Sequence, residues 1–187
     1  LAWLWYLGGR AAEIEWQHAW MNRLDGLNRL FCRRYHRLHA DHIELPEQGP
    51  AIVVANHISG LDPLLMFAAS RRKLRFLIAT EQYYRFGLQW LFRAAGCIPV
   101  DRSGRPERAF REALAALREG EVIALFPHGK IHLDSEPPRH LKGGAVRLAQ
   151  LAECPIYPVR IEGVRAQGRI FRPVFLRARA HLYNRPV

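Results

Sequence analysis

The sequence predicts an α/β fold: a layered, largely parallel mixed sheet flanked by helices, preceded by an amphipathic helical segment. From about residue 41 onward, short β-rich runs alternate with helical runs, an order typical of a domain with a parallel sheet. Two strand candidates, residues 51–55 and 122–126, are continuous apolar runs, which suits strands covered on both faces. The length of 187 residues fits one such domain with a sizeable core.

Residues 1–40 form the helical segment in this interpretation, and residues 41–187 form the α/β domain. Apolar side chains recur in the first segment at steps of three and four residues, with arginines mainly between them. A basic amphipathic helix with tryptophan on its apolar side is found at membrane interfaces, but a helix that packs on its own domain shows the same pattern, and both interpretations stay open. The apolar positions are Trp16, Trp20, Leu24, Leu27, Leu30, Phe31, Tyr35 and Leu38, and the arginines are Arg23, Arg29, Arg33, Arg34 and Arg37.

The other elements follow in order along the chain. Strands are expected at residues 41–45, 51–56, 74–79, 97–101, 122–126, 155–161 and 174–182. Helices are expected at residues 63–71, 82–95, 106–119 and 143–152. Residues 83–93 of the second helix are apolar on nearly every side, which indicates a helix that is either buried in the core or docked on lipid.

The composition narrows the class of protein. An apolar fraction of 49% excludes a mostly disordered chain, and no stretch offers the roughly 20 apolar residues that span a bilayer. The 28 cationic and 17 acidic residues give a net charge of +11, which attracts nucleic acid, anionic lipid or an acidic protein. Three scattered cysteines fit a reducing compartment and small buried side chains, rather than a disulfide framework or a zinc site. Without a phosphate-binding loop, a dinucleotide fingerprint or metal-ligand spacing, no metal or redox cofactor is expected.

A histidine and an aspartate stand where an apolar strand is expected to give way to a helix. The strand ends at Asn56 and His57, and Asp62 with Pro63 suits a helix start, because Asp is a favoured N-cap and Pro a favoured first residue. Five residues apart, His57 and Asp62 would point about 140° apart on one helix, so they can meet only across a turn. An imidazole oriented by a carboxylate is a general-base pair. Taken singly, Asp62 is also an ordinary helix cap and His57 an ordinary hydrogen-bonded residue.

Five blocks between about residues 40 and 165 resemble the glycerolipid acyltransferases, which include the 1-acylglycerol-3-phosphate acyltransferases. The spacing from His57 to Asp62 resembles the H-x4-D signature of that family. Residues 96–102, a glycine and an apolar run that ends in Asp-Arg, resemble the second block. Residues 125–130 resemble the third block, Phe-Pro-Glu-Gly-Thr-Arg, while residues 141–145 and 155–159 resemble the two segments that follow it.

The resemblance implies the acylation of an alcohol without an acyl-enzyme. His57 would take the proton of the acceptor hydroxyl, Asp62 would hold His57, and the hydroxyl would attack the thioester of acyl-CoA or of an acyl carrier protein. The acceptor would be lysophosphatidic acid or a related lysophospholipid. The turn that contains Gly129 follows an apolar strand, and its backbone amides are candidate donors to the oxyanion, although Gly129 is equally an ordinary turn glycine.

The third block departs from the family pattern. Where the family has Glu, Thr and Arg, this chain has His128, Lys130 and Ile131. In the family that Arg is associated with the acceptor phosphate, and Ile131 cannot bind one. We therefore expect a phosphate site rebuilt around Arg102, Lys130 and Lys142, the alternative being that these cations are simply solvated.

The sequence thus predicts a peripheral acyltransferase of phospholipid biosynthesis on the cytoplasmic face of an anionic membrane. Nucleic acid is not an expected partner, since a basic nucleic-acid-binding module would leave the His57–Asp62 pair unexplained. Two further alternatives stay open. Ser59 could be the nucleophile of a lipid hydrolase, although it does not stand in a G-x-S-x-G motif. The altered third block could also mark a homologue that only binds lipid.

Overall fold

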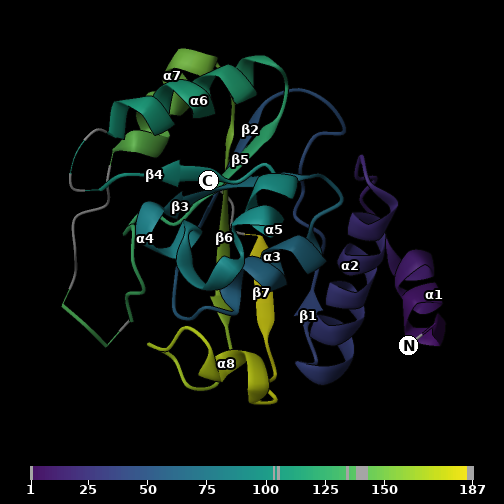
Figure 1. Cartoon of the computed structure of the whole chain (residues 1–187). Coiled ribbons are helices and arrows are strands. Elements are labelled where there is room, and N and C mark those ends of the chain that lie inside the picture. The colour runs from purple at the N-terminus through teal and green to yellow at the C-terminus, as the bar shows by residue number, and fades with distance from the viewer. Residues whose placement is uncertain (1, 103, 105, 134, 138–142, 185–187) are drawn as a thin grey trace.

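A mixed sheet of seven strands forms the centre of the part of the chain that the computed structural model describes, residues 2–102, 104, 106–133, 135–137 and 143–184 (Figure 1). The strand order is β1-β7-β6-β2-β5-β3-β4. Neighbouring strands are parallel except for β6 and β7, so the predicted, largely parallel mixed sheet is confirmed. The strands are β1 (His39–Ala40), β2 (Ala51–Ala55), β3 (Leu74–Ala79), β4 (Ile98–Val100), β5 (Val122–Leu125), β6 (Ile156–Glu162) and β7 (His181–Asn184).

Helices cover both faces of the sheet. The last helices before β5 and β6, α6 and α7, lie together on one face, and α2 and α3 pack on the other, with α1 on the outer side of α2 (Figure 1). The helices are α1 (Ala2–Ala11), α2 (Ala19–Leu30), which continues into a π-helical turn (Phe31–Tyr35), α3 (Asp62–Ala69), α4 (Thr80–Tyr83), a 3-10 turn (Arg85–Gly87), α5 (Gln89–Ala94), α6 (Pro106–Arg118), α7 (Gly144–Ala152) and α8 (Arg172–Phe175). Within the described ranges, no helix is both long and apolar enough to cross a bilayer.

Alternation along the central strands divides the core into two layers. In β2, Ile52 packs with α6 and α7, whereas Ala51, Val53 and Ala55 pack with α2 and α3. Because a strand points successive side chains to opposite faces, an uninterrupted apolar run is needed when both faces are covered. This confirms the interpretation of the apolar runs as strands buried on both sides.

A buried arginine ties the N-terminal helices to the rest of the fold. The Arg29 side chain of α2 is fully buried; its Nε donates to Asp25 Oδ2 at 2.8 Å, and its two other nitrogens donate to the carbonyl oxygens of Ala68 and Ser70. Those carbonyls lie at the C-terminal end of α3, where a cation is favourable. Trp16 is also only 8% exposed and packs against Phe67, so this tryptophan belongs to the core and not to a membrane face.

Three of the expected elements differ from the structure. Residues 41–45 are not a strand, because Ile43 donates its N–H to the Ala69 carbonyl at the end of α3 and not to a neighbouring strand. Residues 174–182 hold the end of α8 and an irregular segment before β7, since Pro173 starts a helical turn. The single helix expected at 82–95 is divided by the 3-10 turn, in which Gly87 adopts a φ of 66° that other residues disfavour.

Candidate active site

The end of β2 is fixed by a side chain that imitates a strand. Asn56 Nδ2 donates to the Ile161 carbonyl at 2.9 Å, and the Ile161 N–H donates to Asn56 Oδ1 at 2.7 Å. This pair extends the contact between β2 and β6 by one residue. The backbone at His57, the next residue, is therefore held at the carboxyl end of the sheet, where sites in α/β proteins form.

His57 and Asp62 meet across the loop between β2 and α3. His57 Nδ1 lies 2.8 Å from Asp62 Oδ2, and the carboxylate is fully buried. Asp62 also accepts the N–H groups of Ile58 and Ser59 at 2.7 and 2.8 Å, and the Ser59 hydroxyl at 2.6 Å. A carboxylate surrounded by donors acts as an acceptor, so Nδ1 of His57 carries a proton and Nε2 presents its lone pair. That is the tautomer of a general base oriented by its carboxylate.

Asp62 is not a helix cap in the expected sense. It is the first residue of α3, Leu61 occupies the N-cap position, and the Asp62 carboxylate bonds the preceding loop instead of the amides of the helix. The carboxylate therefore builds the loop that presents His57, which joins a structural role to the orienting one.

Ser59 is committed to the same loop. Its side chain is fully buried, its hydroxyl donates to Asp62 Oδ1, and the oxygen accepts the Leu61 N–H at 3.2 Å. A hydroxyl enclosed in this way cannot reach a bound lipid. The geometry therefore disfavours Ser59 as the nucleophile of a hydrolase.

The His57 ring stacks on Phe126, which sequence reasoning did not single out. The ring centroids are 4.0 Å apart with an interplanar angle of 14°. Phe126 directly follows β5, the strand beside β2, and stacks in turn near Phe76 of β3 at 5.9 Å. The His132 N–H also donates to the His57 carbonyl at 2.8 Å, so the loop after β5 contacts both the ring and the backbone of His57. A phenylalanine at a neighbouring strand end was the signal that could have found this contact.

Gly129 and Arg102 come together in the loop after β5. The Gly129 N–H donates to the Phe126 carbonyl at 2.8 Å, so this amide closes a turn and is not available to an oxyanion. Arg102 Nη1 donates to the Gly129 carbonyl at 2.5 Å, and its Nη2 lies 3.5 Å from Glu81 Oε2. The Lys130 side chain is exposed beside this turn, whereas Lys142 lies outside the described residues.

Two histidines line the same loop. The rings of His128 and His132 have centroids 4.5 Å apart, and His132 Nδ1 lies 3.0 Å from Glu136 Oε2. His132 is buried, and its contacts make this residue part of the loop that holds His57.

The cysteines and metal-ligating residues do not form a second centre in the described residues. Burial raises the pKa of Cys32 and Cys97 to about 12 and also raises the pKa of Cys154, so all three thiols stay protonated and unreactive at neutral pH. Among the residues that can be placed, no group of three or more His, Cys, Asp or Glu could hold a metal ion.

Known proteins resemble this chain over most of its α/β part. N-acylphosphatidylethanolamine synthase of Arabidopsis thaliana is 34% identical over 124 residues, 61% of this chain and 43% of the relative. The 1-acyl-sn-glycerol-3-phosphate acyltransferase of Streptococcus pneumoniae is 29% identical over 114 residues, 60% of this chain and 41% of the relative. The chain thus spans less than half the length of these two relatives.

A solved structure shares the fold. The 1-acyl-sn-glycerophosphate acyltransferase PlsC from Thermotoga maritima superimposes with a TM-score of 0.70 and 23% identity, covering 89% of this chain and 69% of that one. The model of the family described as Acyltransferase matches residues 37–162, which include the His57–Asp62 pair, the Phe126 stack and the turn at Gly129. With two thirds of its residues inside that match and a buried carboxylate on its strand-end histidine, the chain belongs to the acyltransferase family.

Proposed function

We propose that this protein transfers a fatty acyl group from an acyl thioester to the hydroxyl of a lysophospholipid, with His57 as the general base. The observation that carries the proposal is the contact between His57 Nδ1 and the buried Asp62 carboxylate, which leaves Nε2 to accept a proton. Membership of the acyltransferase family supports the reaction class. The acyl donor is acyl-CoA or an acylated carrier protein.

In the proposed step, His57 Nε2 takes the proton of the acceptor hydroxyl while the hydroxyl oxygen bonds to the thioester carbon. The carbonyl oxygen then carries a negative charge, for which backbone N–H groups of the loop after β5 are candidate donors. Pro127 has no N–H and that of Gly129 is engaged, so the Lys130 N–H is a candidate donor in this turn. When the tetrahedral adduct collapses, the carbon–sulfur bond breaks, the thiolate leaves, and the imidazolium returns its proton to that sulfur.

The acceptor phosphate would be bound by cations near this turn. Arg102 follows β4, Lys130 lies in the loop after β5, and Arg102 contacts the Gly129 carbonyl, which joins the two segments. Guanidinium and ammonium groups bind phosphate by charge-assisted hydrogen bonds. Lys142 stays a candidate third cation on the strength of the resemblance alone.

A second acceptor has a specific observation in its favour. A relative with 34% identity is an N-acylphosphatidylethanolamine synthase, and this chain lacks the family arginine at Ile131. The same base could deprotonate the amine of phosphatidylethanolamine during its attack on the acyl carbon. This reaction would form an amide instead of an ester.

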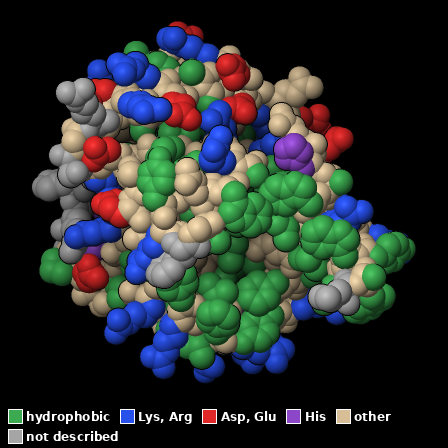
Figure 2. Space-filling model, viewed as in Figure 1, with side chains coloured by type: hydrophobic (Ala, Val, Ile, Leu, Met, Phe, Trp, Pro, Cys, Tyr) green, Lys and Arg blue, Asp and Glu red, His purple; other side chains and the backbone are tan. Residues whose placement is uncertain are grey.

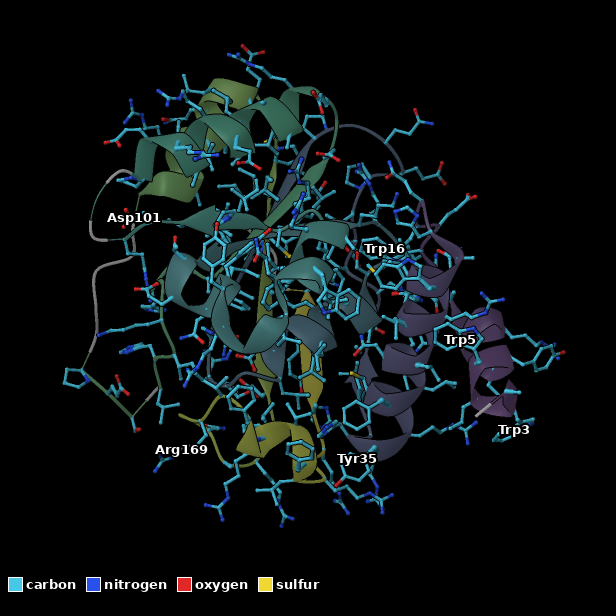
Figure 3. The ribbon with its side chains drawn as sticks, in the orientation of Figure 1. Trp3, Trp5, Trp16, Tyr35, Asp101 and Arg169 are labelled. Carbon is cyan, nitrogen blue, oxygen red and sulfur yellow. The ribbon has the colours of Figure 1, made fainter. Side chains whose placement is uncertain are left out.

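An anionic membrane surface, on its cytoplasmic face, is the proposed location of the enzyme. The support is the net charge of +11 together with exposed aromatic side chains on α1, of which Trp3 is 68% exposed. Figure 3 shows Trp3 pointing away from the body of the protein, in contrast to Trp16. Aromatic and basic side chains together are typical of surfaces that dock on anionic lipid.

An acyl-transfer assay of the purified protein tests the proposal. Acyl-CoA and acylated carrier protein are each offered with lysophosphatidic acid, other lysophospholipids and phosphatidylethanolamine, and both acylated lipid and free fatty acid are measured. We expect acylated lysophospholipid that depends on the acceptor. Release of free fatty acid at a rate independent of the acceptor would instead indicate a hydrolase, and lipid binding without any acyl product would indicate a homologue that only binds lipid.

A further inference from the structure

Four arginines surround one hollow of the protein, away from the contacts of His57. A cavity of about 430 Å³ is lined by Arg37, Gly163, Arg165, Arg177, Ala178 and Arg179. None of the four guanidinium groups forms an ion pair or side-chain hydrogen bond with another described residue. Like charges gathered around one cavity repel each other, and an anion in the cavity would relieve that repulsion.

The cavity is formed where three strands meet. Gly163 follows the end of β6, Arg179 precedes β7, and Arg37 precedes β1. The chain before β1 is joined to β7 by two backbone hydrogen bonds, Ala180 N–H to the His36 carbonyl and His39 N–H to the Ala180 carbonyl. Since β6 runs parallel to β2, the cavity lies at the same edge of the sheet as His57.

The backbone around the cavity adopts conformations that need a reason. A Cβ atom on Gly163 would lie 2.0 Å from the Arg179 carbonyl oxygen, so only glycine allows the ends of β6 and β7 to approach this closely. Arg37 adopts a φ of 48°, which is uncommon for a residue with a long side chain and costs conformational energy. Both features bring guanidinium groups to one place.

An exposed apolar surface lies beside the arginines. Phe175, at the end of α8 and two residues before Arg177, is 74% exposed, and Ile170 is 37% exposed. The Tyr35 hydroxyl donates to the Phe175 carbonyl at 2.6 Å, which holds α8 against the π-helical turn before Arg37. Figure 2 shows Lys and Arg side chains along the lower edge of the molecule next to hydrophobic ones, at the end where Figure 1 places α8 and where Figure 3 labels Tyr35 and Arg169.

We propose that this arginine cavity binds the phosphate group of an anionic membrane phospholipid while Phe175 contacts the lipid interior. Arginine forks match phosphate oxygens, and the exposed phenylalanine beside them favours a lipid over a soluble phosphate compound. The site is distinct from the proposed acceptor site at Arg102 and Lys130. The inference rests on the proposed function of the protein at a membrane surface. It adds a second contact with the membrane to the one proposed for α1.

Vesicle sedimentation of the full chain tests the cavity. The variant Arg177→Gln with Arg179→Gln is compared with the charge-matched control Arg108→Gln with Arg118→Gln on α6, at the opposite end of the molecule (Figure 1). Vesicles contain phosphatidylcholine alone or with phosphatidylglycerol. We expect the affinity for vesicles with phosphatidylglycerol to fall about thirtyfold in the cavity variant and less than about threefold in the control. Binding to phosphatidylcholine alone should be equal in both.

Two results would overturn the proposal. An equal loss in the cavity variant and the control would show that net charge alone drives binding. An unchanged vesicle affinity with a raised KM for acyl-CoA would show that the cavity holds the phosphates of a soluble donor. Because vesicle binding needs no chemistry, it is measured in the His57→Ala background as well. If wild type shows no acyl transfer in any assay but vesicle binding still depends on the cavity, the proposed function is rejected and the cavity proposal stands. If acyl transfer is observed but vesicle binding does not depend on the cavity, the cavity proposal is rejected and the proposed function stands.

Discussion

Three contacts orient His57, and each fixes a different part of the residue. The stack on Phe126 fixes the plane of the ring, and the hydrogen bond to the Asp62 carboxylate fixes the direction in which Nδ1 points. The His132 N–H donates to the backbone carbonyl of His57. The side chain is 17% exposed, so Nε2 can meet a substrate while the rest of the ring stays enclosed. A base held in this way needs little reorganisation before it takes a proton.

We predict that Asp62→Asn weakens both the fold and the reaction. The amide of Asn would bring N–H donors toward the four donors that now converge on the carboxylate, and it would favour the wrong tautomer of His57. The free energy of unfolding in urea should fall by about 1–3 kcal/mol and acyl transfer by about 10² to 10⁴. Asp41→Asn, at an exposed position, is the control. Lower stability with normal turnover would limit Asp62 to building the loop.

Replacing the cations of the turn should affect the acceptor and not the donor. We expect Lys130→Ala and Arg102→Ala each to raise the acceptor KM about ten- to a hundredfold, since one charge-assisted contact is worth about 1.5–3 kcal/mol. Steady-state kinetics with each substrate varied in turn measures this, with Arg111→Ala on α6 as the control. If the acceptor KM stays unchanged while activity falls with every donor, these cations serve the thioester carrier, and lysophosphatidic acid should be replaced by another lipid alcohol as the proposed acceptor.

His36 should make the protein less stable in acid. Its ring is fully buried, Nε2 lies 3.2 Å from the Val174 carbonyl, Nδ1 has no described partner, and burial lowers the pKa from 6.5. Below about pH 6.5, His36 takes up a proton in the unfolded chain, whereas burial opposes this protonation in the folded chain. The free energy of unfolding therefore decreases as the pH is lowered. Urea titrations at several pH values should show a smaller fall in His36→Gln than in wild type or in the exposed control His18→Gln. Equal slopes in all three would exclude His36 as a source of the acid sensitivity.

At the scale of elements, the sheet was predictable because buried parallel strands carry a strong signal. Ala51–Ala55 and Val122–Leu125 are apolar without interruption, and the convergence of their carboxyl ends placed His57 near the loop after β5. A phenylalanine at the end of the neighbouring strand pointed toward the stack of His57 on Phe126, but the contact itself depends on the register between β2 and β5, which no local pattern indicates. The arginine cavity brings together residues more than a hundred positions apart, which no local pattern indicates.

The N-terminal helices combine the two interpretations that the sequence left open. α2 packs on α3 through Arg29, while α1 exposes Trp3 and Tyr6 on its outer side. At Trp16, the periodic apolar pattern of residues 16–38 therefore reflects packing within the protein and not contact with a membrane. The exposed aromatic residues belong to the first ten positions instead.

Removing the exposed aromatics of α1 should weaken docking on any lipid. We expect Trp3→Ser with Tyr6→Ser to lower vesicle affinity about tenfold whether or not the vesicles are anionic, because apolar area is lost and charge is not. The control is Val146→Ser, which is 53% exposed on α7. Sedimentation with neutral and anionic vesicles measures the effect. Unchanged binding to neutral vesicles would exclude α1 as an apolar contact.

At the scale of the whole molecule, the candidate base, the Arg102–Gly129 contact and the arginine cavity all follow strand ends or precede β7 at one edge of the sheet. α6 and α7 cover one face of the sheet, and in Figure 1 they lie at the top while α8 lies at the bottom. If the protein docks on a membrane with the edge of the sheet that carries these sites, His57 would reach lipids while the lipids stay in the membrane. The central claim is that His57 acts there as the base of acyl transfer.

The most direct test is the acyl-transfer rate of folded His57→Ala beside wild type, with both substrates saturating. The variant removes a ring that is only 17% exposed and leaves the Asp62 loop in place, so thermal unfolding and vesicle binding should stay near those of wild type. Turnover should fall by about 10² to 10⁴, the usual contribution of a general base. Near-normal acyl transfer by a folded His57→Ala protein would contradict the account.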